Sequence, residues 1–188
     1  MNSTIIILIL VVAVVGAAAI LYFAQKQKTR NLQTKFGPEY DRLVEIGNRS
    51  RAESELERRE KRVQKFRIHP LSPDQITQFA EAWRAEQARF VDDPRGAVER
   101  ADALVTQVMT ARGYPMTEFE QRTADVSVAH PHVVEHYRAA HDIAQRAAKG
   151  EISTEELRGA LLHYRALFED LLEERVIETE RLSTEVRR

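Results

Sequence analysis

The residues best suited to chemistry lie in one short segment, His132-Val133-Val134-Glu135-His136. This segment matches the H-x-x-E-H pattern of inverted zinc peptidases. On a helix, His132 and His136 would lie one turn apart on one face, where two imidazoles can bind one zinc ion and Glu135 can act as a general base. His130 and His141 add further imidazoles nearby. The cluster therefore indicates either a zinc-dependent hydrolase or a pH-responsive sensor whose histidines titrate at about pH 6–7.

Other features of the sequence argue against a metal centre. Pro131 places His132 in the first helical turn, where the helix dipole favours anions over cations. Glu120 and Glu135 are not followed by histidine at the spacing that a di-iron bundle requires. The absence of cysteine excludes thiolate zinc sites and disulfides. We therefore predict no catalytic, cofactor-binding or metal-binding residue, and expect the histidines on a partly exposed helix face that pairs with neighbouring acids.

The acidic runs of the chain could also be considered as metal carboxylates. The candidates are Glu169, Asp170, Glu173, Glu174, Asp92 and Asp93. Charge runs of this kind are typical of solvated helix faces, so we expect these side chains to point into water.

The N-terminal segment determines where such a site would be held. Residues 5–24 contain no charged side chain, and as a helix they would span roughly 30 Å, the thickness of a bilayer's hydrocarbon core. The segment before the span carries no Lys or Arg, whereas Lys26, Lys28, Arg30 and Lys35 follow it, which predicts a cytoplasmic C-terminal side. The uncharged leader and the long apolar run favour an uncleaved anchor over a signal peptide, although Ala17-Ala18-Ala19 resembles a cleavage site.

The charge balance excludes one class of partner. Taking the four basic residues after the span from the totals of 28 Lys+Arg and 29 Asp+Glu leaves a formal charge of −5 from Phe36 onward. A mildly acidic domain binds polyphosphates poorly, so we expect no nucleic-acid role.

A charged helical stalk is expected after the membrane segment. Phe36-Gly37-Pro38 should end the first helix, because proline cannot continue it and glycine permits a turn. From Glu39 to about Arg67 the chain has the composition of one long polar helix with opposite charges at i,i+4 spacing. A solvated stalk is the interpretation that we favour, with weak homo-oligomerisation through it as the alternative.

Five further helices are predicted by start and stop signals. They are a helix capped by Ser72 and Gln75, one from Pro94 to Gly113, a short one capped by Thr117 and Glu120, one from Pro131 to Lys149 stopped by Gly150, and one capped by Ser153 and Glu156. The aromatic side chains of Phe79, Trp83 and Phe90 have helical spacing and should pack in a core. No segment alternates in the manner of a strand.

The expected fold is therefore all-α: an N-terminal transmembrane helix, a long charged helical stalk and a small antiparallel helical bundle. The predicted domains are an anchor (1–25), a basic juxtamembrane linker (26–38), the stalk (39–70), the bundle (71–175) and a charged tail (176–188).

Three stretches carry a resemblance to known proteins. These are FGPEYDRLVE from Phe36, PLSPDQITQFAEAWRAEQARFVDDPRGAVERADALV from Pro70 and ARGYPMTEFEQRTADVSVAHPHVVEHYRAAH from Ala111. Together they resemble a family of uncharacterised bacterial single-pass membrane proteins over most of residues 36–173, and the W-R-x-x-Q-A-x-F-V-D-D-P string is the most specific part. The resemblance implies a bacterial membrane location and no catalytic residue.

We accordingly expect a protein of the bacterial inner membrane that contacts the bilayer through residues 5–24. Its helical domain would serve as an interaction or scaffold module for a protein partner that the sequence does not identify. The alternatives are the zinc-dependent hydrolase and the pH-responsive sensor described above.

Overall fold

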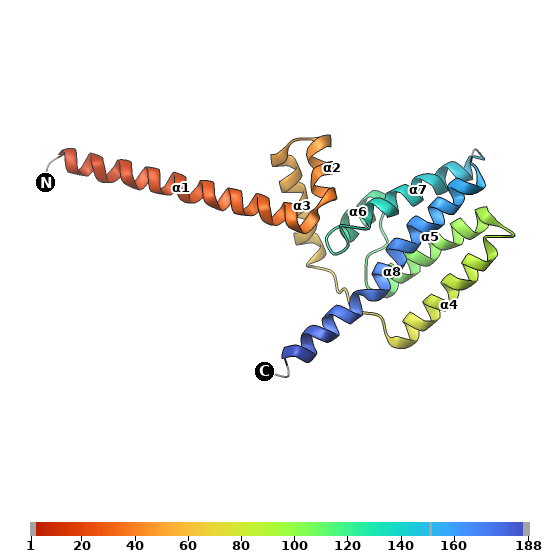
Figure 1. Cartoon of the computed structure of the whole chain (residues 1–188). Helices are drawn as coiled ribbons and strands as arrows, with labels where there is room; N and C mark the ends of the chain where they lie inside the picture. The colour runs from red at the N-terminus through yellow and green to blue at the C-terminus, as the bar shows by residue number, and fades with distance from the viewer. Residues whose placement is uncertain (1–2, 151, 186–188) are drawn as a thin grey trace. The chain divides into compact units, whose positions relative to one another are not determined.

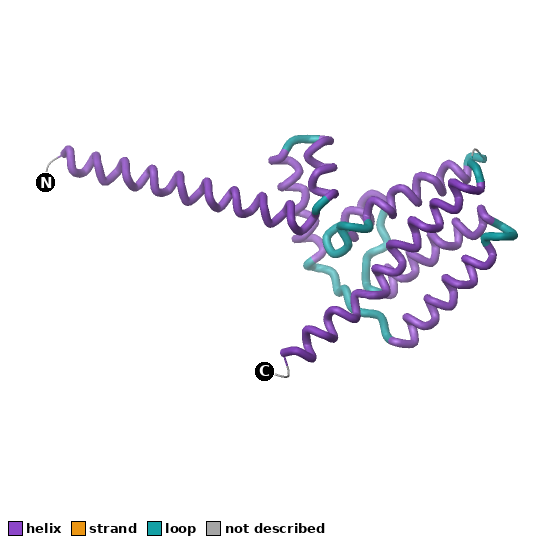
Figure 2. The backbone as a smooth tube through the Cα atoms, viewed as in Figure 1, coloured by secondary structure: helices purple, strands orange, loops and turns teal. Residues whose placement is uncertain are grey.

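The computed structural model describes residues 3–150 and 152–185, and every regular element among them is a helix (Figure 2). The helices are α1 Ser3–Phe36, α2 Pro38–Ile46, α3 Arg49–Val63, α4 Pro73–Arg89, α5 Pro94–Ala111, α6 Phe119–Val126, α7 Val134–Ala148 and α8 Thr154–Glu185 (Figure 1). This confirms the all-α prediction for the described residues. The chain forms two compact units, of which the first ends at Leu56 and the second begins at Glu57.

Helix α1 carries the apolar N-terminal segment. Its part from Leu10 to Phe36 contains an 18-residue window with a mean hydropathy of 1.6, none of which is buried. Val15, Ile20 and Phe23 are 62%, 71% and 66% exposed. Among the described residues there is thus one N-terminal helix that is long and apolar enough to cross a membrane. It ends where we expected, since Gly37 has a φ of +46° and Pro38 opens α2.

The prediction of one long helix from Glu39 to about Arg67 is wrong. The chain breaks after Ile46, where the Gly47 N–H donates to the Leu43 carbonyl and ends α2. Asn48 then starts α3, because its side chain accepts a hydrogen bond from the Arg51 N–H at 3.0 Å. Gly47 and Asn48 are residue types that favour turns. The prediction missed this turn because the segments before and after it have the same polar composition.

The first unit is held together by a buried carboxylate on α3. Glu53 is 2% exposed, and its Oε1 accepts hydrogen bonds from the Thr29 hydroxyl at 2.7 Å and the Tyr40 hydroxyl at 3.3 Å. Burial, followed by the neighbouring Glu53 carboxylate, raises the pKa of Tyr40. These contacts join α1, α2 and α3, so part of the segment that we expected to be a solvated stalk has a buried side.

The second unit contains the larger core. Helix α8 packs along α5 and α7, and α4 packs on α5, with short connections between α4 and α5 and between α7 and α8 (Figure 1). The Trp83 indole stacks on Phe168 with ring centroids 4.6 Å apart, which confirms that Trp83 belongs to the core. Phe79 and Phe90 lie partly buried at the margin of the same cluster.

Most of the predicted helix ends are confirmed in this unit. Ser72 and Gln75 exchange both hydrogen bonds of a capping box, as do Ser153 and Glu156. Hydrogen bonds from the Ser153 N–H and from Arg146 lower the pKa of Glu156 to about 2. Gly150, with a φ of +94°, follows the end of α7 as expected.

The capping box predicted at Thr117 is wrong. Helix α6 begins at Phe119, and its cap residue is Glu118, whose side chain makes no capping hydrogen bond. The Thr117 N–H donates to the Pro115 carbonyl in a tight turn, and the Thr117 hydroxyl is buried without a hydrogen-bond partner. This turn moves the helix start and leaves the hydroxyl unable to cap it.

The end of the chain continues the last helix. The backbone of α8 is helical to Glu185, beyond the predicted bundle end at 175. The side chains of residues 174–188, which include the whole predicted tail (176–188), lie outside the described residues, as do residues 186–188 altogether.

Candidate functional site

Five histidines gather around the start of α7 and the facing part of α8. His130 and His132 lie in the connection before α7, His136 and His141 lie on α7, and His163 lies on α8. The expectation that His132 and His136 share one helix face is wrong, because α7 begins at Val134 and His132 precedes it. The Val133 N–H donates to the His130 carbonyl in a turn, which delays the helix after Pro131.

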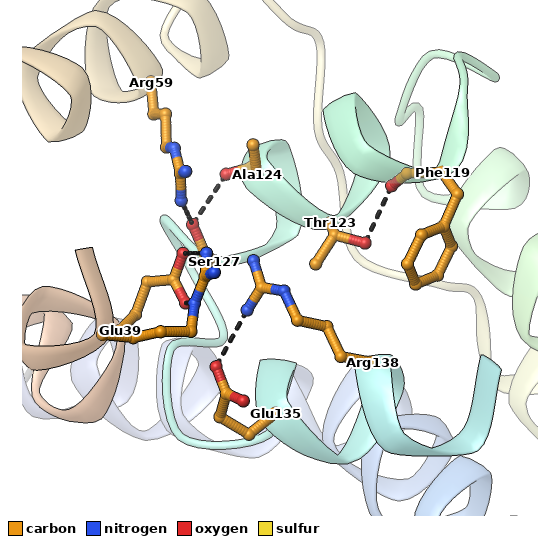
Figure 3. Close-up of polar contacts among 9 residues, drawn as sticks. Glu39, Arg59, Phe119, Thr123, Ala124, Ser127, Glu135 and Arg138 are labelled. Carbon is orange, nitrogen blue, oxygen red and sulfur yellow. Dashed lines mark hydrogen bonds and ion pairs between the residues drawn. The ribbon is translucent and has the colours of Figure 1, made fainter. Parts of the chain in front are cut away.

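The connection that carries His130 and His132 is fixed through α6. At the C-terminal end of α6, the Asp125 carboxylate is 1% exposed and accepts a hydrogen bond from Arg62 of α3 at 2.9 Å. Arg59, one turn before Arg62 on α3, donates to the hydroxyl of Ser127, which directly follows α6, at 3.1 Å. The Ser127 hydroxyl in turn donates to the Ala124 carbonyl at 2.7 Å (Figure 3). The C-terminal part of α3 therefore holds the segment from which the histidines project.

Asp170 on α8 joins the two histidines of this connection. Its carboxylate contacts His130 Nδ1 through Oδ2 and His132 Nε2 through Oδ1, the latter at 2.9 Å. His130 is buried, whereas the His132 side chain is 65% exposed. We call this set the Asp170 bridge. The expectation of a solvated Asp170 is wrong, since its side chain is only 22% exposed.

The ionisation of Asp170 reflects two opposing effects. Burial raises its pKa, but the hydrogen bonds and charges of His130 and His132 outweigh burial and hold the pKa below its usual value. The carboxylate therefore stays ionised and ties α8 to the start of α7.

A second contact joins α7 and α8 one helical turn further along. His136 Nδ1 lies 2.9 Å from His163 Nδ1, and the rings stack with centroids 5.1 Å apart at 28°. Burial, and then the neighbouring His136, lowers the pKa of His163. His163 was missed by the sequence analysis. The sequence did contain a sign of its position. His163 lies two helical turns before Asp170, so a helix through both residues places them on the same face.

The predicted general base has another role. Glu135 accepts a hydrogen bond from Arg138 at 2.9 Å on the same helix (Figure 3). His132 is held by Asp170 and His136 by His163, so the structure does not bring the three H-x-x-E-H residues together. Among the side chains that the structure describes, residues 10–150 and 152–173, no group of three or more His, Asp or Glu is arranged to hold a metal ion.

His141 lies apart from both contacts. Its ring stacks on Phe119 of α6 at a centroid distance of 3.6 Å, and burial lowers its pKa. Both side chains line an open pocket of about 350 Å³ with Glu118, Glu120, Arg138, Asp142 and Gln145. The lining contains no serine, threonine, cysteine or lysine, the side chains that most often act as nucleophiles.

No family model matches the chain, and neither a curated protein nor a solved structure matches it. The chemistry of the histidine region must therefore come from its own contacts. Carboxylate–imidazole pairs join α8 to the connection before α7, and an imidazole–imidazole pair joins α8 to α7 itself. These contacts hold the two helices and their connection together.

Proposed function

We propose that this chain is a single-pass membrane-anchored helical module that binds or organises a protein partner and has no catalytic activity. The observation that carries the proposal concerns α1 from Leu10 onward. This part of the helix contains an 18-residue apolar stretch, and none of these residues is buried. Apolar surface in water costs about 25 cal/mol per Å², so a helix of this kind needs lipid around it. A bilayer supplies that environment, with residues 5–24 as the segment inside it.

The same segment suggests an orientation. Lys26, Lys28, Arg30 and Lys35 follow the span and place the helical units on the cytoplasmic side by the positive-inside rule. The resemblance to bacterial single-pass membrane proteins makes the inner membrane the proposed location. Tethering raises the local concentration of weakly bound partners, so a modest protein interface is sufficient. Weak self-association through residues 39–70 is a further part of this proposal.

Membrane retention after an alkaline wash tests the anchor. The full-length protein should remain in the membrane fraction, and a Val12→Arg, Val15→Arg variant should leave it, since each arginine at the centre of a span costs about 2.5–3.5 kcal/mol. Val91→Arg is the matched control, because Val91 is 83% exposed in the connection between α4 and α5. Release of the wild type, or equal retention of the double variant, would contradict the anchor.

Proximity crosslinking in intact membranes tests the interaction role. Reactive groups introduced at exposed positions of the helical units should trap the same protein in repeated experiments, and a copy of this chain would support self-association. If the crosslinked proteins differ from one repeat to the next without a common partner, the result would contradict the proposed interaction role.

The Asp170 bridge favours a second candidate, a pH-responsive module. The contact between α8 and the connection before α7 consists of one carboxylate and two imidazoles, and imidazole is the side chain that ordinarily changes charge between pH 5 and 8. Asp170 also acts on Tyr114, whose pKa burial raises to about 12 and which is in turn influenced by Arg112 and Asp125. Helix content or oligomer size should then change between about pH 5 and 8 in the wild type and not in Asp170→Asn. A flat wild-type profile would remove this candidate.

A further inference from the structure

Two histidines on neighbouring helices, His136 of α7 and His163 of α8, approach each other through like ring nitrogens. Their Nδ1 atoms lie 2.9 Å apart across the contact between α7 and α8. Imidazole nitrogens bind first-row divalent metals at about 2.0–2.1 Å, so two ligands at a right angle around one ion are about 2.9 Å apart, and two tetrahedral ligands about 3.3 Å. The observed separation equals the right-angle spacing, and it is also the length of the hydrogen bond that joins the two rings without an ion.

Right-angle coordination distinguishes between metals. Cu²⁺ and Ni²⁺ prefer square-planar or tetragonal sites with nitrogen and oxygen ligands, whereas structural Zn²⁺ is tetrahedral. Cu²⁺ also has the highest intrinsic affinity for such ligands in the series of divalent ions. From this geometry we propose that His136 and His163 form a two-histidine binding site for a divalent cation of the Cu²⁺ or Ni²⁺ type, with water in the remaining positions.

The protonation of the pair suits this role. In the neutral pair one Nδ1 carries the proton of the shared hydrogen bond and the other accepts it. On metal binding that proton moves to Nε2 of the same ring, both Nδ1 lone pairs bind the ion, and the neutral pair releases no net proton. The lowered pKa of His163 keeps its imidazole in the neutral form that binds metals.

The contact lies at the surface of the second unit. His136 is exposed and His163 is half-buried. On the turn of α8 before His163, a Cβ added at Gly159 would meet no atom within 4 Å. The ion would thus bind at the surface, linking α7 to α8.

This site differs from the H-x-x-E-H motif. His132 is bonded to Asp170 and Glu135 to Arg138, so neither is needed for the proposed coordination. The two hypotheses share His136 but require different second ligands, His132 in the motif and His163 in the structure. Single substitutions therefore separate them.

The test uses untagged, full-length protein in detergent, freed of metal and titrated with CuCl₂, NiCl₂ and ZnCl₂ by calorimetry. We expect one equivalent of Cu²⁺ to bind more tightly than Zn²⁺, and electron paramagnetic resonance of the Cu²⁺ form to show two equatorial nitrogen ligands. His136→Ala and His163→Gln should each weaken binding by more than the roughly 10–100-fold that loss of an outer-shell partner costs.

His132→Ala and the exposed His69→Ala serve as controls and should bind Cu²⁺ with wild-type affinity. Circular dichroism of each variant checks that the helices remain folded. Undiminished binding in both His136→Ala and His163→Gln would overturn the proposal. A loss in His132→Ala with wild-type binding in His163→Gln would overturn it in favour of the motif.

Discussion

Asp170 and its neighbour Glu169 have different surroundings in the folded protein, although both belong to one acidic run of the sequence. Asp170 is bonded to two histidines and Glu169 only to Arg165 at 2.7 Å one turn away. The difference arises because Asp170 faces the connection before α7, whereas Glu169 points to solvent. Composition alone cannot separate the two carboxylates.

Asp170→Asn should destabilise the second unit in a pH-dependent way. The pKa of Asp170 is lower in the folded protein than its ordinary value of 3.8, so its stabilising effect is present above about pH 4 and is lost as the pH falls through the folded value. We expect the variant to lose about 1–3 kcal/mol at pH 7 and the difference to shrink towards pH 3.

The measurement is urea unfolding followed by the fluorescence of Trp83, the single tryptophan, which stacks on Phe168 of α8. Glu169→Gln is the control, because an exposed i,i+4 pair contributes only about 0.3–0.5 kcal/mol. Equal losses in the two variants, or a difference that does not begin to shrink as the pH falls below about 4, would contradict the role assigned to the Asp170 bridge.

At the scale of elements, helix ends follow local rules until a tertiary contact or a tight turn intervenes. Ser72 and Ser153 cap their helices as the sequence indicates, because each capping box is completed within four residues. Thr117 has the same pattern but is drawn into a turn with Pro115.

Ser72→Ala and Thr117→Val should therefore have opposite consequences. Loss of the Ser72 cap removes an acceptor for the Gln75 N–H and should cost about 0.5–2 kcal/mol. Thr117→Val replaces a buried hydroxyl that has no hydrogen-bond partner with a methyl group, and should be neutral or slightly stabilising. Thermal unfolding by circular dichroism compares the two. A larger loss at Thr117 would show that its hydroxyl caps α6 after all.

Gly113 and Gly150 make a matched pair of helix-ending glycines with φ of +91° and +94°. A Cβ at Gly113 would lie 2.4 Å from the Arg67 carbonyl oxygen, whereas at Gly150 it would meet nothing within 4 Å. We expect Gly113→Ala to cost about 2–5 kcal/mol and Gly150→Ala about 1 kcal/mol. Unfolding free energies in urea measure both, and equal costs would show that backbone strain alone governs these positions.

The helix boundaries also show why part of the fold and most of the site could not be predicted. Proline, glycine and capping signals located the start of α2 and both ends of α4 and α5 to within a few residues, because such signals act locally. The break at Gly47 was hidden by the polar composition on both sides. The pairing of His136 with His163 depends on the alignment of two helices, which a single sequence does not specify.

At the scale of the whole molecule, the basic residues after the span should set the orientation. A Lys26→Gln, Lys28→Gln, Arg30→Gln variant removes three positive charges close to the membrane and should move a share of a C-terminal reporter to the outside, since the rule counts charges within about 15–20 residues of the span. The control is Arg49→Gln, Arg51→Gln, Arg58→Gln. It removes the same number of positive charges at positions more than 20 residues after the end of the span at Ala24.

Paired cytoplasm-active and export-active reporters measure both variants. The wild type and the distant control should report a cytoplasmic C-terminal side. An export-active signal in the wild type would reverse the proposed orientation, and equal shifts in the two variants would show that total charge, not position, decides it.

The packing of α8 against both α5 and α7 also sets an order of events during synthesis. The apolar segment is complete by Ala24, but the core of the second unit requires side chains as late as Phe168 and Leu171. At about 5–20 residues per second, the ribosome needs roughly 7–30 s to pass from one to the other. During that interval a chain already committed to the bilayer would expose α4, α5 and α7 without their common partner, so nascent chains held at the membrane are the species most open to proteases and chaperones.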